Sequence, residues 1–236
     1  MRVLSSPADV STATPDPLAR WAAQALLPGR GGAAWAHGDA VAVLAPALFR
    51  FDRLVLTGPA ADVSTLLRAH VRPDVRPVVA TAVADELDWP VHGTFGWMER
   101  SGGLDPDPGV RWLSEGEDDD VEALLRKANP DSWVRPREPG PVRWAGLHVD
   151  DALVAVAADA WPSPDVGFIA GVATHPDHRG RSLSTKVCSF VASALLAGHG
   201  TCGLMVDRSN AAAIAVYRRL GFAYRSVTAL RDPAHT

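Results

Sequence analysis

The stretch that decides the fold is His175-Pro-Asp-His-Arg-Gly-Arg-Ser-Leu-Ser184. The residues before it, 166–174, are almost all apolar over the length of one strand, which is typical of a strand buried on both faces of a sheet. After it, apolar side chains recur at helical spacing through residues 182–198. The sequence therefore predicts a buried strand, a tight polar loop and a long helix in succession.

The loop in this unit has the composition of an anion-binding site. Small residues at Gly180, Ser182 and Ser184 allow backbone N–H groups to point outward at the start of the helix, where the helix dipole also favours negative charge. Arg179 and Arg181 add positive charge on mobile side chains. The alternative is an ordinary capped helix, because none of these features requires a ligand by itself.

The distribution of charge along the chain also indicates an anionic ligand. The 236 residues carry 23 basic and 27 acidic side chains, and the net charge of −4 argues against a general nucleic-acid binder. Residues 105–177 hold 6 basic and 15 acidic side chains, whereas residues 178–236 hold 8 basic and 2 acidic ones. A basic segment within an acidic protein favours a small polyanionic ligand, although solvated helix faces would give the same counts.

The last part of the chain predicts alternating strands and helices. A strand at 201–206, a helix at 210–220 and a strand at 222–230 follow the first strand and helix. Two strands of one sheet that are joined through a helix are parallel, so we expect the strands at 166–174 and 201–206 to be parallel neighbours.

The stretch 101–109 separates two parts of the chain, because it concentrates Gly, Pro and Asp with almost nothing to bury. It predicts an N-terminal α/β domain over residues 1–104 and a second domain over 105–236. The elements expected in the first part are a hairpin at 33–46 that turns at Gly38-Asp39, a strand at 53–58, a helix at 60–70 and a strand at 93–99. Those expected next are a short strand at 110–113, a helix that begins in the acidic run 115–120, a loop at 129–141, and a hairpin of strands 142–149 and 153–160.

A second motif is Asn210-Ala-Ala-Ala-Ile-Ala-Val-Tyr-Arg-Arg-Leu-Gly-Phe222, in which Asn210 and Tyr217 lie two helical turns apart on one face. Together with the Arg179-Gly-Arg-Ser-Leu-Ser184 loop, it resembles the GNAT acyltransferase superfamily. That superfamily has a cofactor loop Arg/Gln-x-x-Gly-x-Gly/Ala and, later, Asn-x-x-Ala-x-x-x-Tyr followed by Leu-Gly-Phe. The resemblance covers about residues 110–232, and it reaches the first hundred residues only by analogy to two-domain members with a degenerate N-terminal half.

The resemblance implies an α/β fold with a mixed, splayed β-sheet flanked by helices, and a smaller α/β N-terminal domain. It also implies acetyl-CoA as the co-substrate, with the pantetheine arm between the strand ending at Thr174 and the strand ending at Val206. The cofactor-binding residues that it assigns are Val172, Ala173, Thr174, Arg179, Gly180, Arg181, Ser182, Leu183, Ser184 and Asn210. Serine at 182 and 184 departs from the family pattern and would be costly at a positive φ. Serine is nevertheless favourable at a helix start, so we expect a functional loop.

Tyr217 is the catalytic acid that the resemblance assigns. An amine attacks the thioester directly, which requires chiefly positioning, and the CoA thiolate leaves. A tyrosine with a pKa of about 10 can give a proton to the thiolate of a thiol with a pKa of about 8.5. A core aromatic beside Leu220 and Phe222 is the alternative reading of Tyr217.

The sequence offers only scattered candidates for a general base. His148 on the predicted hairpin and Asp165 before the buried strand are the two that we name, and a structural role also explains each of them. His175 and His178 have the spacing of a metal pair, but no third ligand lies near them in sequence, so no metal site is expected.

These features predict an acetyl-CoA-dependent N-acetyltransferase that acts on the amine of a small molecule or peptide. The alternative is a catalytically silent protein of the same fold that binds acyl-CoA or a partner protein as a sensor. We expect no nucleic-acid or membrane partner, and a homodimer stays open. Cys188 and Cys202, the only cysteines, fit a reducing cytoplasm, which is the expected location.

Overall fold

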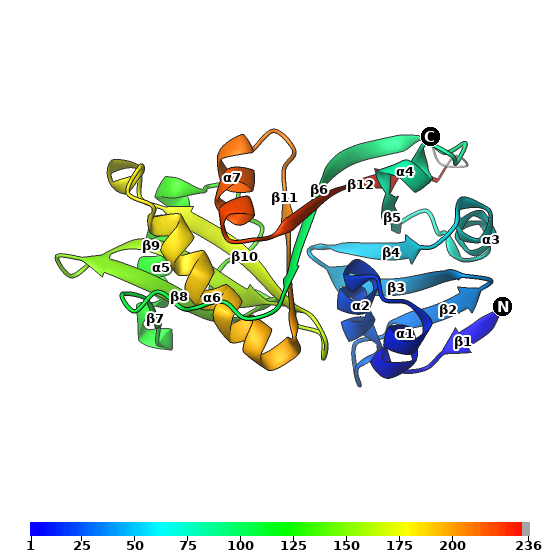
Figure 1. Ribbon diagram of the computed structural model, residues 1–236, viewed down its shortest axis with the longest axis horizontal. Coiled ribbons are helices and arrows are strands. Elements are labelled where there is room, and N and C mark those ends of the chain that lie inside the picture. The colour runs from blue at the N-terminus through cyan, green and yellow to red at the C-terminus, as the bar shows by residue number, and fades with distance from the viewer. Residues whose placement is uncertain (233–236) are drawn as a thin grey trace.

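A continuous mixed β-sheet runs through residues 1–232, the part of the chain that the computed structural model describes (Figure 1). The order across the sheet is β1-β2-β3-β4-β5-β12-β6-β11-β10-β9-β8-β7. The strands are β1 (Arg2–Leu4), β2 (Ala33–His37), β3 (Ala40–Leu48), β4 (Phe51–Thr57), β5 (Arg76–Ala80), β6 (Val91–Ser101), β7 (Arg111–Trp112), β8 (Pro141–Val149), β9 (Ala152–Ala160), β10 (Gly167–Thr174), β11 (Thr201–Val206) and β12 (Ala223–Leu230).

Helices cover both faces of this sheet. They are α1 (Pro7–Ala13), α2 (Pro17–Ala22), α3 (Ala60–His70), α4 (Thr81–Ala84), α5 (Asp118–Ala128), α6 (Leu183–His199) and α7 (Ala211–Arg219), with short 3-10 turns η1 (Ala23–Leu26), η2 (Glu115–Glu117) and η3 (Pro176–His178). The buried residues of α1, α2 and α5 share one apolar core, whereas α6 and α7 pack in a second core. Trp97 and Met98 are successive residues of β6 and belong to different cores, so these two cores lie on opposite faces of the sheet. None of the helices in residues 1–232 combines the length and apolar character needed to cross a membrane.

Local signals in the sequence account for most of the predicted elements. The acidic run before α5 is confirmed as a helix start, where Ser114 and Glu117 form a capping box. The hairpin of β8 and β9 is also confirmed, and it turns at Asp150 and Asp151, which both have positive φ. The sequence did not reveal β1, α1, α2, β5 or α4.

The predicted parallel pair at the centre of the fold is confirmed. β10 pairs with β11 in parallel, and their other neighbours, β9 and β6, run antiparallel to them. The sheet is therefore mixed and flanked by helices, as expected.

Strand β6 connects the two halves of the sheet (Figure 1). It lies between β11 and β12, although it precedes both by about a hundred residues in the chain, and β12 in turn pairs with β5. A domain boundary after residue 104 stays a prediction. A division after residue 104 would assign β6 to the first domain and its two neighbours in the sheet, β11 and β12, to the second.

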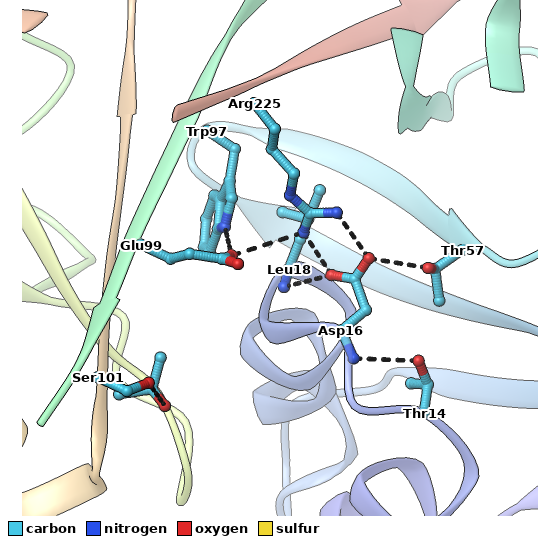
Figure 2. A network of polar contacts seen from close by, with 9 residues as sticks. Thr14, Asp16, Leu18, Thr57, Trp97, Glu99, Ser101 and Arg225 are labelled. Atoms are coloured by element: carbon cyan, nitrogen blue, oxygen red, sulfur yellow. Dashed lines mark hydrogen bonds and ion pairs between the residues drawn. The ribbon is translucent and has the colours of Figure 1, made fainter. Parts of the chain in front are cut away.

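A polar network also ties the N-terminal helices to β12 (Figure 2). Asp16 is the N-cap of α2, where its carboxylate accepts from the Leu18 N–H at 2.8 Å, and it also accepts from the Thr57 hydroxyl at 2.8 Å. The Arg225 guanidinium donates to both oxygens of Asp16 and lies 3.7 Å from Glu99. Burial alone would raise the pKa of Asp16, but these hydrogen bonds and the charge of Arg225 hold it below its ordinary value.

Candidate active site

The two central parallel strands separate towards their carboxyl ends. Their pairing runs from Gly167 opposite Cys202 to Ile169 opposite Leu204, and it stops there, although β10 continues to Thr174 and β11 to Val206. A cavity of about 700 Å³ occupies the gap. The predicted splay of these strands is thus present, and it leaves the edge of β10 free of a strand partner on this side.

A bulge at Gly171 accompanies the separation. The register of β10 against β9 shifts between Ala170 and Ala173, and Gly171 has a φ of +60°. A Cβ at Gly171 would lie 2.5 Å from Cη2 of Trp144, so only glycine fits both this conformation and this contact. The bulge turns the last residues of β10 away from β11.

The cavity passes through the sheet. Its lining residues Cys188, Val216 and Tyr217 belong to the face covered by α6 and α7. Phe49, Phe95 and Val134, which also line it, belong to the opposite face. A molecule that enters along the α6 loop and one that enters from the other face could therefore meet between β10 and β11.

Nine of the ten predicted cofactor residues line this cavity. They are Val172, Ala173, Thr174, Arg179, Gly180, Ser182, Leu183, Ser184 and Asn210. The tenth, Arg181, is exposed and outside the lining. The loop before α6, the end of β10 and the start of α7 thus come together as the motif spacing predicted.

The conformation of the loop before α6 differs from what serine led us to expect. Ser182 stands at the N-cap of α6, but it has a φ of +58° and its side chain makes no capping hydrogen bond. Serine thus occupies a left-handed position that glycine would hold without strain, and the expectation of an ordinary serine cap is wrong. Gly180, with a φ of +77°, gives the loop a second left-handed turn.

Several of the predicted cofactor groups already have partners within the protein. Arg179 donates to the Ala128 carbonyl at the end of α5 (3.2 Å), and the Asn129 amide donates to the Val172 carbonyl (3.4 Å). Asn210 caps α7 by accepting from the Ala213 N–H at 3.0 Å. The hydroxyl of Thr174, in contrast, is buried and has no hydrogen-bond partner in residues 1–232, so it is available to a ligand in the cavity.

Tyr217 projects from α7 into the same cavity and is 7% exposed. Burial, with smaller contributions from Cys188 and Cys202, raises its pKa well above 10. The hydroxyl therefore keeps its proton at neutral pH. Tyr217 also packs with Leu220 and Phe222 in the core, so the two readings that the sequence left open are compatible.

The structure does not bring the two predicted base candidates to the cavity. His148 lies on β8 beside Glu117, with 3.6 Å between its Nε2 and the carboxylate. Asp165 precedes β10, at the end of the strand away from the cavity, and it forms an ion pair with Arg20 at 3.0 Å. A hydrogen bond from Ser11 and the pairing with Arg20 hold the pKa of Asp165 below its usual value.

The far end of the cavity contains residues that sequence reasoning did not identify. Phe49 and Arg53 come from the first half of the chain, and Asp131 and Trp133 come from the proline-rich loop after α5. The sequence contained one indication of these residues. Arg53 is a charged residue that stands directly before the apolar residues 54–56 of a predicted strand.

The comparisons with known proteins identify the family of this fold. The sequence profile of the acetyltransferase (GNAT) family matches residues 98–222, which is more than half of the chain. The chain belongs to this family.

Solved structures of other members share the fold at low sequence identity. A GCN5-related N-acetyltransferase from Kribbella flavida is 20% identical, with a TM-score of 0.54 over 85% of this chain and 89% of that one. A GNAT-family protein from Novosphingobium aromaticivorans is 22% identical, with a TM-score of 0.50 over 84% and 90% of the two chains. An acetyltransferase from the GNAT family of Colwellia psychrerythraea is 12% identical, with a TM-score of 0.51 over 85% of each chain. No curated protein matches the sequence.

Proposed function

We propose that the protein is an acetyl-CoA-dependent N-acetyltransferase that acts on the amine of a small molecule or peptide. The observation that carries this proposal is the cavity between β10 and β11, which is lined by the loop before α6, by Tyr217 and by residues from both faces of the sheet. Family membership supports the same chemistry.

The residues present fit acetyl-CoA at the α6 side of this cavity. The left-handed turns at Gly180 and Ser182 lie directly before the N-terminus of α6, where backbone N–H groups and the helix dipole favour phosphate. The edge of β10 from residue 170 to 174 has no strand partner on the β11 side, and apart from the Val172 carbonyl, which accepts from Asn129, it offers main-chain groups to an extended amide-containing arm. Thr174, with its unpartnered hydroxyl, lies at the end of that edge.

Acetyl-CoA supplies an activated acetyl thioester. The cavity positions an amine against it and excludes water, which accounts for a large part of the rate in a direct transfer. Tyr217 holds a proton at its hydroxyl for the departing sulfur. The amine enters in its neutral form, and the proton that its nitrogen loses as the amide bond forms restores the tyrosine hydroxyl. Burial raises the pKa of Tyr217 above its ordinary value, so the hydroxyl keeps its proton until the sulfur departs.

His148 and Asp165 lie outside the cavity lining, so neither is part of this proposal. A cytoplasmic location and a small soluble acceptor are consistent with it and belong to the same hypothesis.

The proposal is tested by two measurements on the full chain. The first is the melting temperature with and without CoA, since a ligand that binds only the folded state adds about 2.7 kcal/mol at one hundred times its Kd. The second is release of free CoA thiol from acetyl-CoA over a panel of amines. We expect a CoA-dependent rise in melting temperature and amine-dependent thiol release.

The outcomes separate the two readings of the sequence. Stabilisation by CoA without thiol release for any amine would identify a silent acyl-CoA-binding protein. No stabilisation at millimolar CoA would contradict both readings.

A further inference from the structure

The far end of the cavity holds a buried arginine without a carboxylate partner. Arg53 on β4 is 4% exposed, and its Nε donates to the Leu48 carbonyl at 3.0 Å. No carboxylate in residues 1–232 forms an ion pair with it or affects its pKa. Its terminal nitrogens, which carry most of its donors, thus have no protein acceptor in this part of the chain.

The surroundings of Arg53 make its charge costly. Burial and the neighbouring charge of Arg76, its partner in the register of β4 and β5, lower the pKa of Arg53 to about 10. At neutral pH it remains protonated. The guanidinium carbon lies 6.0 Å from the centre of the Phe49 ring and 5.7 Å from that of the Phe51 ring, which offsets part of this cost. A buried charge without an anionic partner is still costly to a fold, so its presence beside a cavity is a reason to look for an anionic ligand.

The other charged groups of the cavity do not neutralise Arg53. Asp207 accepts two hydrogen bonds from Ser209, both at 2.7 Å, and Arg179 has the same sign as Arg53. Asp131 lines the cavity without an ion pair to Arg53. The guanidinium is therefore free for a group that enters from outside.

Aromatic side chains surround this end of the cavity. The rings of Phe49 and Trp133 lie 5.0 Å apart, and Phe95 on β6 also contributes to the lining. Ala47, Phe49 and Arg50 all have positive φ, so the connection between β3 and β4 is strained where it delivers Phe49 to the cavity. A ligand held here by Arg53 therefore lies in a cavity that aromatic rings also line.

We propose that Arg53 binds the carboxylate of the acceptor, which is then a small amine that also bears a carboxylate and an apolar or aromatic side chain. This inference rests on the proposed function, because it names the acceptor class of the same cavity. The planar guanidinium matches a carboxylate through two parallel hydrogen bonds. Arg53 is a specificity-determining residue in this assignment and takes no part in proton transfer.

The test compares acceptors that differ only in the carboxylate. L-phenylalanine, L-phenylalaninamide and 2-phenylethylamine share the ring and the amine, and they are offered with acetyl-CoA to the wild-type chain and to Arg53→Gln. We expect the wild type to favour phenylalanine over the amide by about ten- to a hundredfold in kcat/KM, the range for a charged hydrogen-bonded pair. In Arg53→Gln this preference should disappear through a rise in the KM for phenylalanine, with the KM for acetyl-CoA unchanged.

Two further variants keep the result interpretable if Arg53→Gln folds poorly. Arg53→Lys retains the positive charge but cannot form the two parallel hydrogen bonds of a guanidinium. We therefore expect it to keep part of the preference for phenylalanine over the amide. Arg76→Gln removes the neighbouring arginine, which does not line the cavity, and we expect the preference to be retained. Equal use of phenylalanine and its amide by the wild type, or an equal loss for both in Arg53→Gln, would overturn the proposal.

Binding distinguishes this inference from the proposed function. Titration calorimetry of the wild-type chain with CoA bound should show tighter binding of phenylalanine than of phenylalaninamide, whether or not turnover occurs. Tighter binding without thiol release would contradict the acetyltransferase proposal and support the role of Arg53. Thiol release without any preference for phenylalanine over phenylalaninamide, in binding or in turnover, would support the acetyltransferase proposal and contradict the role of Arg53.

The carboxylate could instead belong to the acyl group. Succinyl-CoA in place of acetyl-CoA, with 2-phenylethylamine as acceptor, tests this source. If Arg53→Gln lost activity with succinyl-CoA while acetyl transfer to phenylalanine remained intact, the acceptor assignment would be wrong.

Discussion

Tyr217 lines the cavity with a hydroxyl that has no hydrogen-bond partner in residues 1–232. Replacement by phenylalanine removes only that oxygen, so the packing against Leu220 and Phe222 is retained. General acid assistance contributes about 10²–10⁴-fold, and we expect Tyr217→Phe to lower kcat by that factor where the chemical step limits the rate. The KM for acetyl-CoA and the melting temperature should change little, as measured by steady-state kinetics and thermal unfolding.

Tyr224, the second tyrosine of the chain, provides the matched control. It lies on β12 outside the cavity lining, so Tyr224→Phe should leave kcat unchanged. A kcat that did not respond to Tyr217→Phe would mean that water protonates the thiolate. A large fall in melting temperature would instead assign Tyr217 to the core alone.

The two arginines of the α6 loop should differ in their effect on CoA binding. Arg179 lines the cavity and also holds the Ala128 carbonyl, whereas Arg181 is exposed outside the lining. We expect Arg179→Ala to raise the Kd for CoA by about ten- to a hundredfold, and Arg181→Ala to raise it less, since a charged hydrogen bond contributes about 1.5–3 kcal/mol. Calorimetric titration with CoA and with pantetheine measures both values. Equal losses for the two ligands would show that Arg179 acts by holding α5 in place.

The residues of the α6 loop and α7 could be predicted from sequence because two motifs, one in the loop and one in α7, resemble those of the GNAT superfamily. Arg53, Phe49 and Trp133 could not be predicted in this way. They reach the cavity from two distant segments, and their approach depends on the pairing of β6 with β11 and β12. Nothing in the local sequence of these segments specifies that pairing.

At the scale of elements, the bulge in β10 opens the site. Gly171→Ala would place a Cβ against the Trp144 ring at a positive φ, so we expect a loss of about 2–5 kcal/mol in the free energy of unfolding from strain and overpacking together. Chemical unfolding with urea measures this loss.

Gly102 is the matched control, because it has a φ of +86° but nothing lies within 4 Å of the position of its Cβ. Gly102→Ala carries only the cost of the backbone conformation, which is about 1–2 kcal/mol. If the two variants lost the same stability, the contact with Trp144 would not be what requires glycine at 171.

Elements with acidic residues in the first helical turn, an alternating pattern or a turn signal were predicted correctly, as α5 and the β8–β9 hairpin show. Short elements such as β1 and α4 were missed because they have too few residues to show a period. The left-handed Ser182 was also missed, since serine usually favours an extended cap and the surrounding loop overrides that preference.

At the scale of the whole molecule, Asp16 joins α2, β4 and β12 (Figure 2). We expect Asp16→Asn to lower the free energy of unfolding at pH 7 by about 2–4 kcal/mol. Removal of one partner of a buried pair costs about 3–5 kcal/mol, and Arg225 keeps its contact with Glu99. Urea unfolding of the wild type and the variant measures the difference.

The difference should depend on pH in a definite direction. The folded pKa of Asp16 lies below its ordinary value of 3.8, so the stabilisation is fully present above pH 3.8 and is lost as the pH falls through the folded pKa. The gap between wild type and Asp16→Asn should therefore shrink on acidification below about pH 4. Asp74→Asn, at an exposed carboxylate, should show little effect at any pH. A gap that did not change with pH would mean that the loss in Asp16→Asn does not come from the charge of Asp16.

The position of β12 in the sheet affects how the chain folds. Among the strands of residues 1–232, β12 comes last in the chain, yet it lies between β5 and β6, where Val227 stands opposite both Ala80 and Phe95. Until it arrives, β5 and β6 each have an unpaired edge, and such edges are templates for association with other chains. Pairing across so large a sequence separation is also slow, because loop closure must precede any gain from contacts. The edges of β5 and β6 that face each other across the sheet are thus closed only after β12 has been synthesised.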